Sequence, residues 1–133
     1  MKTEISNSLS QSFLFADVDW KEVPDKPGVY VISDLREIIY VGMAGRNGKG
    51  SVRNRLRDHA SGQIVNMFAQ YLFLARVQFV HDKRITHPRD AKKACRRYIS
   101  DRCSFRYLAT RDGVEARKFE TLLKSELRPI LNP

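Results

Sequence analysis

Two runs of β-branched and aromatic residues surround a short polar turn in the first third of the chain. The first run follows Lys26 and reads K-P-G-V-Y-V-I-S, the turn reads D-L-R-E, and the second run reads I-I-Y-V-G-M. Runs of this kind around a polar turn are typical of a β-hairpin. A later segment, Cys103–Ala109, alternates well enough to predict a third strand with Phe105 and Tyr107 on one face.

Helical patterns occupy much of the remaining chain. Ser51 follows the glycine-rich loop G-R-N-G-K-G and can cap a helix that runs to about Ala60. Residues 64–79 predict a mostly buried helix, although the last of them could form a strand instead. Pro88 suits the first turn of another helix. The apolar stripe of that helix consists of Ala91, Ala94, Cys95, Tyr98 and Ile99.

The last helix is predicted over about residues 113–127. Asp112 and Glu115 form a D-x-x-E variant of the capping box at its start, and Pro129 stops it. Its core-facing stripe consists of Phe119, Leu122, Leu123 and Leu127. The predicted order is β-β-α, two inserted helices, β and α. We therefore expect an α+β fold with a small three-stranded sheet, mixed or antiparallel, that is covered by helices.

Length and composition limit what this fold can be. The 133 residues, 42% of them hydrophobic, suffice for one core, so we expect a single domain over 1–133. Two cysteines exclude a disulfide scaffold. Residues 1–11 lack the apolar stretch of a secretory signal, and polar residues interrupt 64–80 too often for a membrane span. We expect a cytoplasmic, intracellular protein that is not secreted and has no membrane partner.

The positive charge of the chain is concentrated in two segments. The formal net charge is +9, which favours a polyanionic partner. Residues 43–60 carry +4 and residues 83–111 carry +8, whereas residues 1–42 carry −3. Two solvated helix faces would explain the charge equally well. The basic row of the second segment, which could neutralise several phosphates, consists of Arg89, Lys92, Lys93, Arg96 and Arg97.

Two tyrosines occupy the middles of the paired strands. If Ser33 lies opposite Glu37, Tyr30 faces Tyr40 directly and both hydroxyls emerge on one face of the sheet. A slip by one residue would send the two side chains to opposite faces. The sequence leaves the register open, and tyrosines that only pack the sheet are the alternative interpretation.

Further polar candidates lie on the first and last helices. Arg55 and His59 are four residues apart, so they share a face and lean toward the sheet. An inward guanidinium needs an anionic partner, whereas a histidine beside an apolar stripe is often only structural. Glu120 lies at the edge of the last helix's stripe. The amide of Asn132, beyond the helix end, could lock the C-terminus onto the domain.

In combination, these residues resemble the GIY-YIG nuclease family. Gly28-Val29-Tyr30 resembles the first family motif and Tyr40-Val41-Gly42 the second. On the first helix, Arg55 resembles the arginine of the family, and His59 resembles the family residue one turn later. Near the C-terminus, Glu120 in F-E-T-L-L-K resembles the metal-binding glutamate, and Asn132 in R-P-I-L-N resembles the late asparagine. These positions span 28–132, nearly the whole chain.

The resemblance implies a metal-dependent endonuclease that hydrolyses phosphodiester bonds in DNA, with RNA or branched nucleic acid as other possible substrates. It assigns one divalent cation, Mg²⁺ or Mn²⁺, to Glu120. Tyr30 would act as the base or position the water, with Tyr40 as its partner. The metal's field, Arg55 or proton transfer toward His59 would lower the pKa of the phenol. Arg55 would stabilise the pentacovalent phosphate, and Asn132 would be a scaffold residue. The oligomeric state, monomer or homodimer, stays open.

The chain also departs from the family. Met43 follows the second motif where some relatives have a lysine, and Arg46 or Lys49 could supply the missing charge. Residues 62–102 resemble a basic helical insertion, and residues 1–20 form an N-terminal extension. The candidates for nucleic-acid contact are Arg53, the two basic residues of the loop, Arg46 and Lys49, and the basic row Arg89, Lys92, Lys93, Arg96 and Arg97.

Two other functions fit the same sequence. One is a nucleic-acid-binding module of the same fold that no longer cleaves. The other is an interaction domain whose basic helix, residues 88–101, docks onto an acidic protein or an RNA surface.

Overall fold

The computed structural model describes residues 4–63, 66–80 and 84–132. Within these ranges the helices are α1 (Val52–Ala60), α2 (Met67–Ala75), α3 (Pro88–Arg102) and α4 (Gly113–Leu127). The strands are β1 (Phe13–Leu14), β2 (Gly28–Asp34), β3 (Glu37–Ala44) and β4 (Cys103–Ala109). Short 3-10 helices are η1 (Ile5–Ser8), η2 (Trp20–Glu22), η3 (Arg46–Gly48) and η4 (Val77–Phe79).

The fold is α+β, and the described strands form one antiparallel sheet in the order β1-β4-β2-β3. The sequence predicted three strands, and the described residues form four. The additional strand, β1, lies in the expected N-terminal extension and pairs Phe13 with Phe105 of β4. Its two residues are too few to produce an alternating pattern, which is why the sequence did not reveal it.

A bulge decides which face of the sheet each hairpin tyrosine occupies. At the turn Asp34 pairs with Glu37, and beyond the irregularity between Ile32 and Ser33 the register shifts by one residue. Tyr40 then pairs with Ile32, while Tyr30 pairs with Gly42. The direct Tyr30–Tyr40 pairing that one register would give is therefore not formed. The two tyrosines nevertheless share a face, because Gly42, the partner of Tyr30, lies two residues after Tyr40 on β3 and side chains alternate along a strand.

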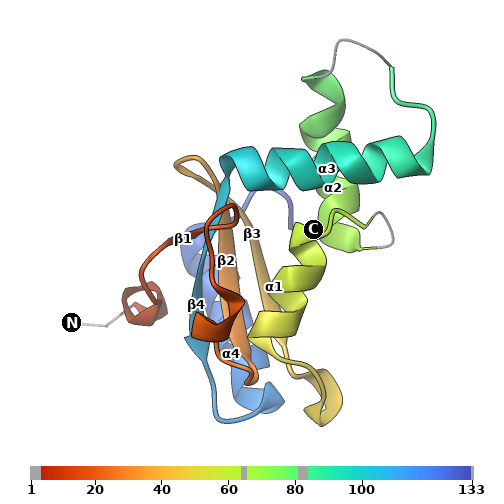
Figure 1. Ribbon diagram of the computed structural model, residues 1–133. Helices are drawn as coiled ribbons and strands as arrows, with labels where there is room; N and C mark the ends of the chain where they lie inside the picture. The colour runs from red at the N-terminus through yellow and green to blue at the C-terminus, as the bar shows by residue number, and fades with distance from the viewer. Residues whose placement is uncertain (1–3, 64–65, 81–83, 133) are drawn as a thin grey trace.

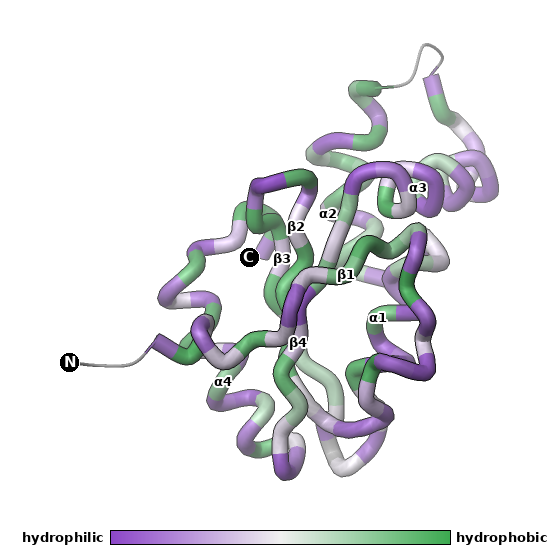
Figure 2. Tube along the Cα trace, turned by 60° about the vertical axis from the view of Figure 1, so that its left-hand side comes forward, coloured by the Kyte–Doolittle hydropathy of each residue, from purple (hydrophilic) through white to green (hydrophobic). Residues whose placement is uncertain are grey.

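Helices cover both faces of the sheet (Figures 1 and 2). On the face that carries Tyr30 and Ile32, α1, α2 and α3 build the larger core cluster. On the opposite face, α4 and the N-terminal segment pack against Val29, Val31 and Val41. The strand β3, at the end of the sheet order, is an edge strand that side chains from both layers can reach.

Most predicted helices form where their patterns placed them. Ser51 caps α1 by accepting a hydrogen bond from Asn54, and all five apolar stripe residues of α3 are buried. Of the segment 64–79, residues 64–65 lie outside the described residues, and the remainder forms α2 and η4 rather than a strand. None of the described helices combines the length and the apolar character that crossing a membrane requires.

The core stripe of α4 differs from the expected one. Leu123 is fully buried and Phe119 and Leu127 are partly buried, but Leu122 is 41% exposed. The prediction was wrong at Leu122 because it lies about 100° around the helix from Leu123. Ala116, seven residues before Leu123, is buried in its place.

A buried carboxylate joins the α2–α3 segment to the hairpin. Asp34 is 2% exposed, and Arg76 and Arg102 each place a guanidinium nitrogen 3.0 Å from one of its oxygens. The Tyr98 hydroxyl also donates to Asp34, and Arg76 makes a second ion pair with Glu37. Because Arg76, Tyr98 and Arg102 all bond to this one carboxylate, Asp34 anchors α3 and the segment after α2 to the β2–β3 turn.

We predict that Asp34→Ala lowers the free energy of unfolding by about 3 kcal/mol, because it leaves two guanidinium groups and a phenol without their shared acceptor. Urea unfolding monitored by circular dichroism measures this loss. Glu37→Gln is the matched control, since Glu37 is exposed and shares only Arg76, and we expect a loss below about 1 kcal/mol. Equal losses in the two variants would contradict the anchoring role.

Candidate active site

A cleft of about 610 Å³ opens beside the edge strand β3. Its walls come from β2, β3, the loop after β3, α1 and α4. Six residues singled out from the sequence line it: Tyr30, Tyr40, Arg46, Lys49, Arg55 and Glu120. The cleft thus collects polar groups that are up to 90 positions apart in the chain.

Gly42 allows the Tyr30 hydroxyl to reach this edge. A Cβ atom at Gly42 would lie 2.4 Å from the hydroxyl oxygen of Tyr30, closer than any real contact. Tyr30 is 1% exposed, so its ring is core while its oxygen borders the cleft. Position 42 therefore requires a glycine for a steric reason, because the side chain of Tyr30 lies across it.

Behind the cleft, His59 connects two polar side chains. Its Nε2 lies 2.6 Å from the Tyr30 hydroxyl, and its Nδ1 lies 2.9 Å from Oδ1 of Asn66. The backbone N–H of Phe68 also donates to that Asn66 oxygen, which identifies the atom as an acceptor. His59 therefore carries its proton on Nδ1, and its Nε2 accepts the hydrogen bond that Tyr30 donates.

Sequence reasoning missed Asn66. As an asparagine directly before an apolar run, it can be read as an N-cap, and it does cap α2. Its second bond, to an imidazole on α1, depends on how α1 and α2 pack together. Asn54, Asp58 and Met67 also line the cleft and were not singled out.

Burial disfavours the charged forms of the buried groups. Desolvation, with a smaller contribution from the positive charge of Arg55, lowers the pKa of His59 to about 3. Desolvation and the neighbouring Tyr40 raise the pKa of Tyr30 well above its ordinary value, although the charge and hydrogen bond of Arg55 act in the opposite direction. Burial likewise raises the pKa of Tyr40. At neutral pH the chain from Tyr30 to Asn66 is therefore uncharged.

Three aromatic rings enclose the imidazole. The centroid of the His59 ring lies 5.4 Å from that of Tyr30, 5.8 Å from that of Tyr40 and 5.0 Å from that of Phe68. His59 itself is 0% exposed. The rings keep water away from the imidazole, so its proton exchange is directed toward Tyr30 and Asn66.

Glu120 reaches the cleft from the layer opposite to Tyr30. Its side chain is 18% exposed, and one oxygen lies 3.8 Å from Lys124. Within the described part of the chain, no three His, Cys, Asp or Glu side chains gather into a metal-binding group. A Mg²⁺ ion commonly takes one or two protein carboxylates and completes its shell with water and substrate phosphates. Glu120, with Asp58 lining the same cleft, fits that mode of binding.

The C-terminal segment covers the outer edge of β3. The Asn132 amide accepts from the N–H of Val41 at 2.7 Å and donates to the carbonyl of Val41 at 2.9 Å. The backbone N–H of Leu131 donates to the carbonyl of Ile39. Asn132 thereby satisfies edge groups of β3 and does not line the cleft.

The other candidates for nucleic-acid contact lie outside the cleft. Arg53, a candidate for nucleic-acid contact, is partly buried, and its Nε donates to the carbonyl of Val23 at 2.8 Å. On α3, Arg97 approaches Asp101 at 3.8 Å. The row of basic residues that the sequence singled out on α3 does not line the cleft; it consists of Arg89, Lys92, Lys93, Arg96 and Arg97.

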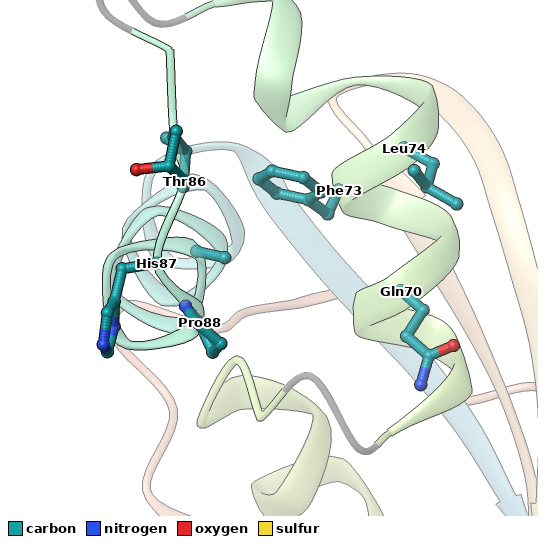
Figure 3. A pocket seen from close by; sticks show the side chains of 8 residues that line it. Gln70, Phe73, Leu74, Thr86, His87 and Pro88 are labelled. Atoms are coloured by element: carbon teal, nitrogen blue, oxygen red, sulfur yellow. The ribbon is translucent and has the colours of Figure 1, made fainter.

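A separate hollow of about 360 Å³ lies between α2 and the start of α3. In Figure 3, Phe73 points from α2 toward the segment that contains Thr86, His87 and Pro88. The lining is mostly apolar. It therefore lacks the combination of carboxylate, guanidinium and phenol that marks the cleft beside β3.

We predict that His59 stays neutral at pH values well below the ordinary pKa of histidine, and that its suppressed protonation makes the stability of the fold depend on pH. An unfolded histidine takes up a proton near pH 6.5, whereas the folded one does so only near pH 3. The unfolded state thus binds more protons in this interval, and stability falls as the pH decreases from about 6.5 toward 3.

Two measurements test this expectation. The ¹⁵N shifts of the His59 imidazole should show the neutral Nδ1–H form at pH 5. The urea midpoint should decrease between pH 7 and pH 5, and His59→Gln should reduce that decrease. A charged imidazole at pH 6, or an unchanged pH dependence in the variant, would contradict the burial argument.

The chain was also compared with known proteins. No family model matches it, and no curated protein matches it. The interpretation of the cleft therefore depends on its own geometry and chemistry.

Proposed function

We propose that this chain is a metal-dependent endonuclease of the GIY-YIG type that hydrolyses phosphodiester bonds in DNA. The observation that carries the proposal is the single cleft beside β3, where Tyr30, Tyr40, Arg55 and Glu120 meet. These residues come from separate strands and helices, and a role in packing alone would not require them to converge. Phenol, guanidinium and carboxylate are the groups that phosphodiester hydrolysis uses.

Tyr30 positions the attacking water. Its hydroxyl donates to His59 and accepts from Arg55, and the second lone pair of the oxygen would accept a hydrogen bond from a water in the cleft. As that water attacks phosphorus, Tyr30 takes its proton and passes its own proton to Nε2 of His59. A free phenolate, which burial disfavours, is never required. Asn66 keeps Nε2 available by holding the other ring proton.

Arg55 faces the phosphoryl group. It is exposed on α1 and lines the cleft, so a substrate phosphate can reach its planar fork. Negative charge that accumulates on the phosphoryl oxygens is stabilised there. The bound phosphate also offsets the positive charge of Arg55, which otherwise lowers the pKa of His59. Substrate binding thereby makes His59 a better proton acceptor.

Glu120 would hold the divalent cation, Mg²⁺ or Mn²⁺. When bound, such an ion supplies Lewis-acid stabilisation of the phosphoryl oxygens and of the leaving alkoxide. Arg46 and Lys49, in the loop after β3, border the same cleft and offer the cationic contacts that Met43 does not provide. Tyr40 packs its ring against His59 and Phe68, which helps to fix the imidazole.

We predict that the purified protein nicks supercoiled plasmid DNA in the presence of Mg²⁺ and that Glu120→Gln and Arg55→Ala each slow nicking by about 100-fold or more. Tyr30→Phe should cause a similar loss, because it removes the hydroxyl that is proposed to position the attacking water. Agarose gels of time courses give the rates.

Matched controls lie on the same two helices. Glu115→Gln changes another carboxylate of α4, and glutamine can still accept the hydrogen bond from the backbone N–H of Arg111. Arg57→Ala removes an exposed guanidinium of α1 that does not line the cleft. Both should cleave at nearly the wild-type rate. Full activity of Glu120→Gln would refute the metal assignment. DNA binding without any Mg²⁺-dependent nicking would favour a catalytically silent binding module of the same fold.

We further predict that Asn66 acts through the tautomer of His59. Asn66→Asp retains an acceptor for Nδ1 and a helix cap, so it should nick within about tenfold of the wild-type rate. Asn66→Ser retains the cap but is too short to reach His59, and it should lose about 100-fold.

The ¹⁵N spectrum of His59 separates this role from a structural one. In Asn66→Ser the ring proton should redistribute between Nδ1 and Nε2, while the urea midpoint stays close to that of Asn66→Asp. A slow variant whose His59 retains the Nδ1–H form would show that Asn66 does not set the tautomer.

A further inference from the structure

A second cleft, of about 640 Å³, adjoins the first. The two share Met43, Gly45 and Arg46, so the loop after β3 forms a wall of both. The opposite wall of the second cleft is the beginning of α4, with Arg117 and Lys118. The sequence did not single out either of these two residues.

The loop and α4 are in direct contact. A Cβ atom on Gly113, the first residue of α4, would lie 2.2 Å from the carbonyl oxygen of Gly45. Only a glycine allows this approach, so the backbone of the loop fixes the start of the helix beside β3. The relative position of the two clefts is therefore set by backbone packing and not by flexible side chains.

Among the described residues, the cations of the second cleft have no ion-pair partner. Arg46, Arg117 and Lys118 are exposed, and within the described residues none of them forms an ion pair. One acidic residue, Asp112, also lines the cleft. Its carboxylate caps α4 by accepting from the N–H of Glu115, and it lies 3.7 Å from Arg111. The cleft keeps a positive balance that is accessible to an anion.

The helix α4 contributes lining residues to both clefts. Arg117 precedes Glu120 by three residues, so the two lie on neighbouring sides of α4, about 4.5 Å apart along its axis. Consecutive phosphates of one DNA strand are spaced on the same scale, about 3.4 Å along the duplex axis. A strand that follows α4 from Glu120 toward the start of the helix would place its next phosphates beside Arg117.

We propose that the nucleic-acid strand continues from the cleft beside β3 into this second cleft, where Arg46, Arg117 and Lys118 bind its backbone phosphates. This inference rests on the proposed nuclease function and names the surface that grips the substrate. It differs from the grip on the basic helix that the sequence favoured. The C-terminal end of α3 is bonded to Asp34 at the β2–β3 turn, the opposite end of the hairpin from the loop at Gly45 (Figure 1).

DNA binding without cleavage provides the test. A fluorescein-labelled duplex is titrated in EDTA at several salt concentrations, and anisotropy gives the Kd. Arg117→Ala/Lys118→Ala should raise the Kd by about tenfold or more and reduce the slope of log Kd against log salt by about 1.8, since each phosphate contact contributes about 0.9. Unfolding midpoints within about 2 °C of wild type verify that the variants fold.

The matched control removes the same charge from α3. Arg89→Ala/Lys93→Ala should change the Kd by less than about twofold and leave the salt slope nearly unchanged. Wild-type binding by the α4 variant, or a larger loss in the α3 variant, would overturn the inference even if the wild-type protein nicks DNA. If the α4 variant loses binding but wild type never nicks with Mg²⁺, the nuclease proposal fails and the grip stands. If wild type does not bind the duplex, the inference fails, and the nicking assay decides the nuclease proposal separately.

Discussion

The hydrogen-bond chain from Tyr30 through His59 to Asn66 constrains the candidate site more than any other interaction. An imidazole that is 0% exposed must satisfy both nitrogens, and it finds its two partners on β2 and directly before α2. Its own backbone belongs to α1. One buried ring therefore fixes the relative positions of three elements, and a shift of any of them would leave a polar group unpaired in an apolar environment.

The sheet adds a second constraint at the same place. The hairpin turn alone would set a register in which Tyr30 and Tyr40 point to opposite faces, and the bulge next to Ile32 corrects it by one residue. Gly42 then leaves room for the Tyr30 hydroxyl at the edge strand. Because the edge is open to both layers, Glu120 can approach from the face opposite to Tyr30. Convergence of the site thus depends on backbone irregularity as much as on the side chains.

These features show what could be predicted from the sequence and what could not. The hairpin, α1, α3 and α4 carry strong local signals, such as the Ser51 cap and the apolar stripe of α3, and local signals are read directly from the chain. The two-residue strand β1 and the bulge leave no periodic trace. The bond of Asn66 to His59 was missed for another reason, because it depends on how two helices pack. Leu122 was misassigned because runs of leucine fit more than one helical stripe.

The distribution of charge shows the same limit. Residues 112–133 carry four basic and four acidic groups, whereas residues 83–111 carry a net charge of +8. The zero net charge of the C-terminal segment therefore gave no indication of a cationic surface on α4. In space the balance differs: Glu126 turns to the backbone of η1, and Glu115 accepts from the N–H of Arg111. Arg117 and Lys118 are left facing the cleft beside Gly45. A ligand encounters the charges that one surface presents together, so the net charge of a segment does not by itself locate a cationic surface.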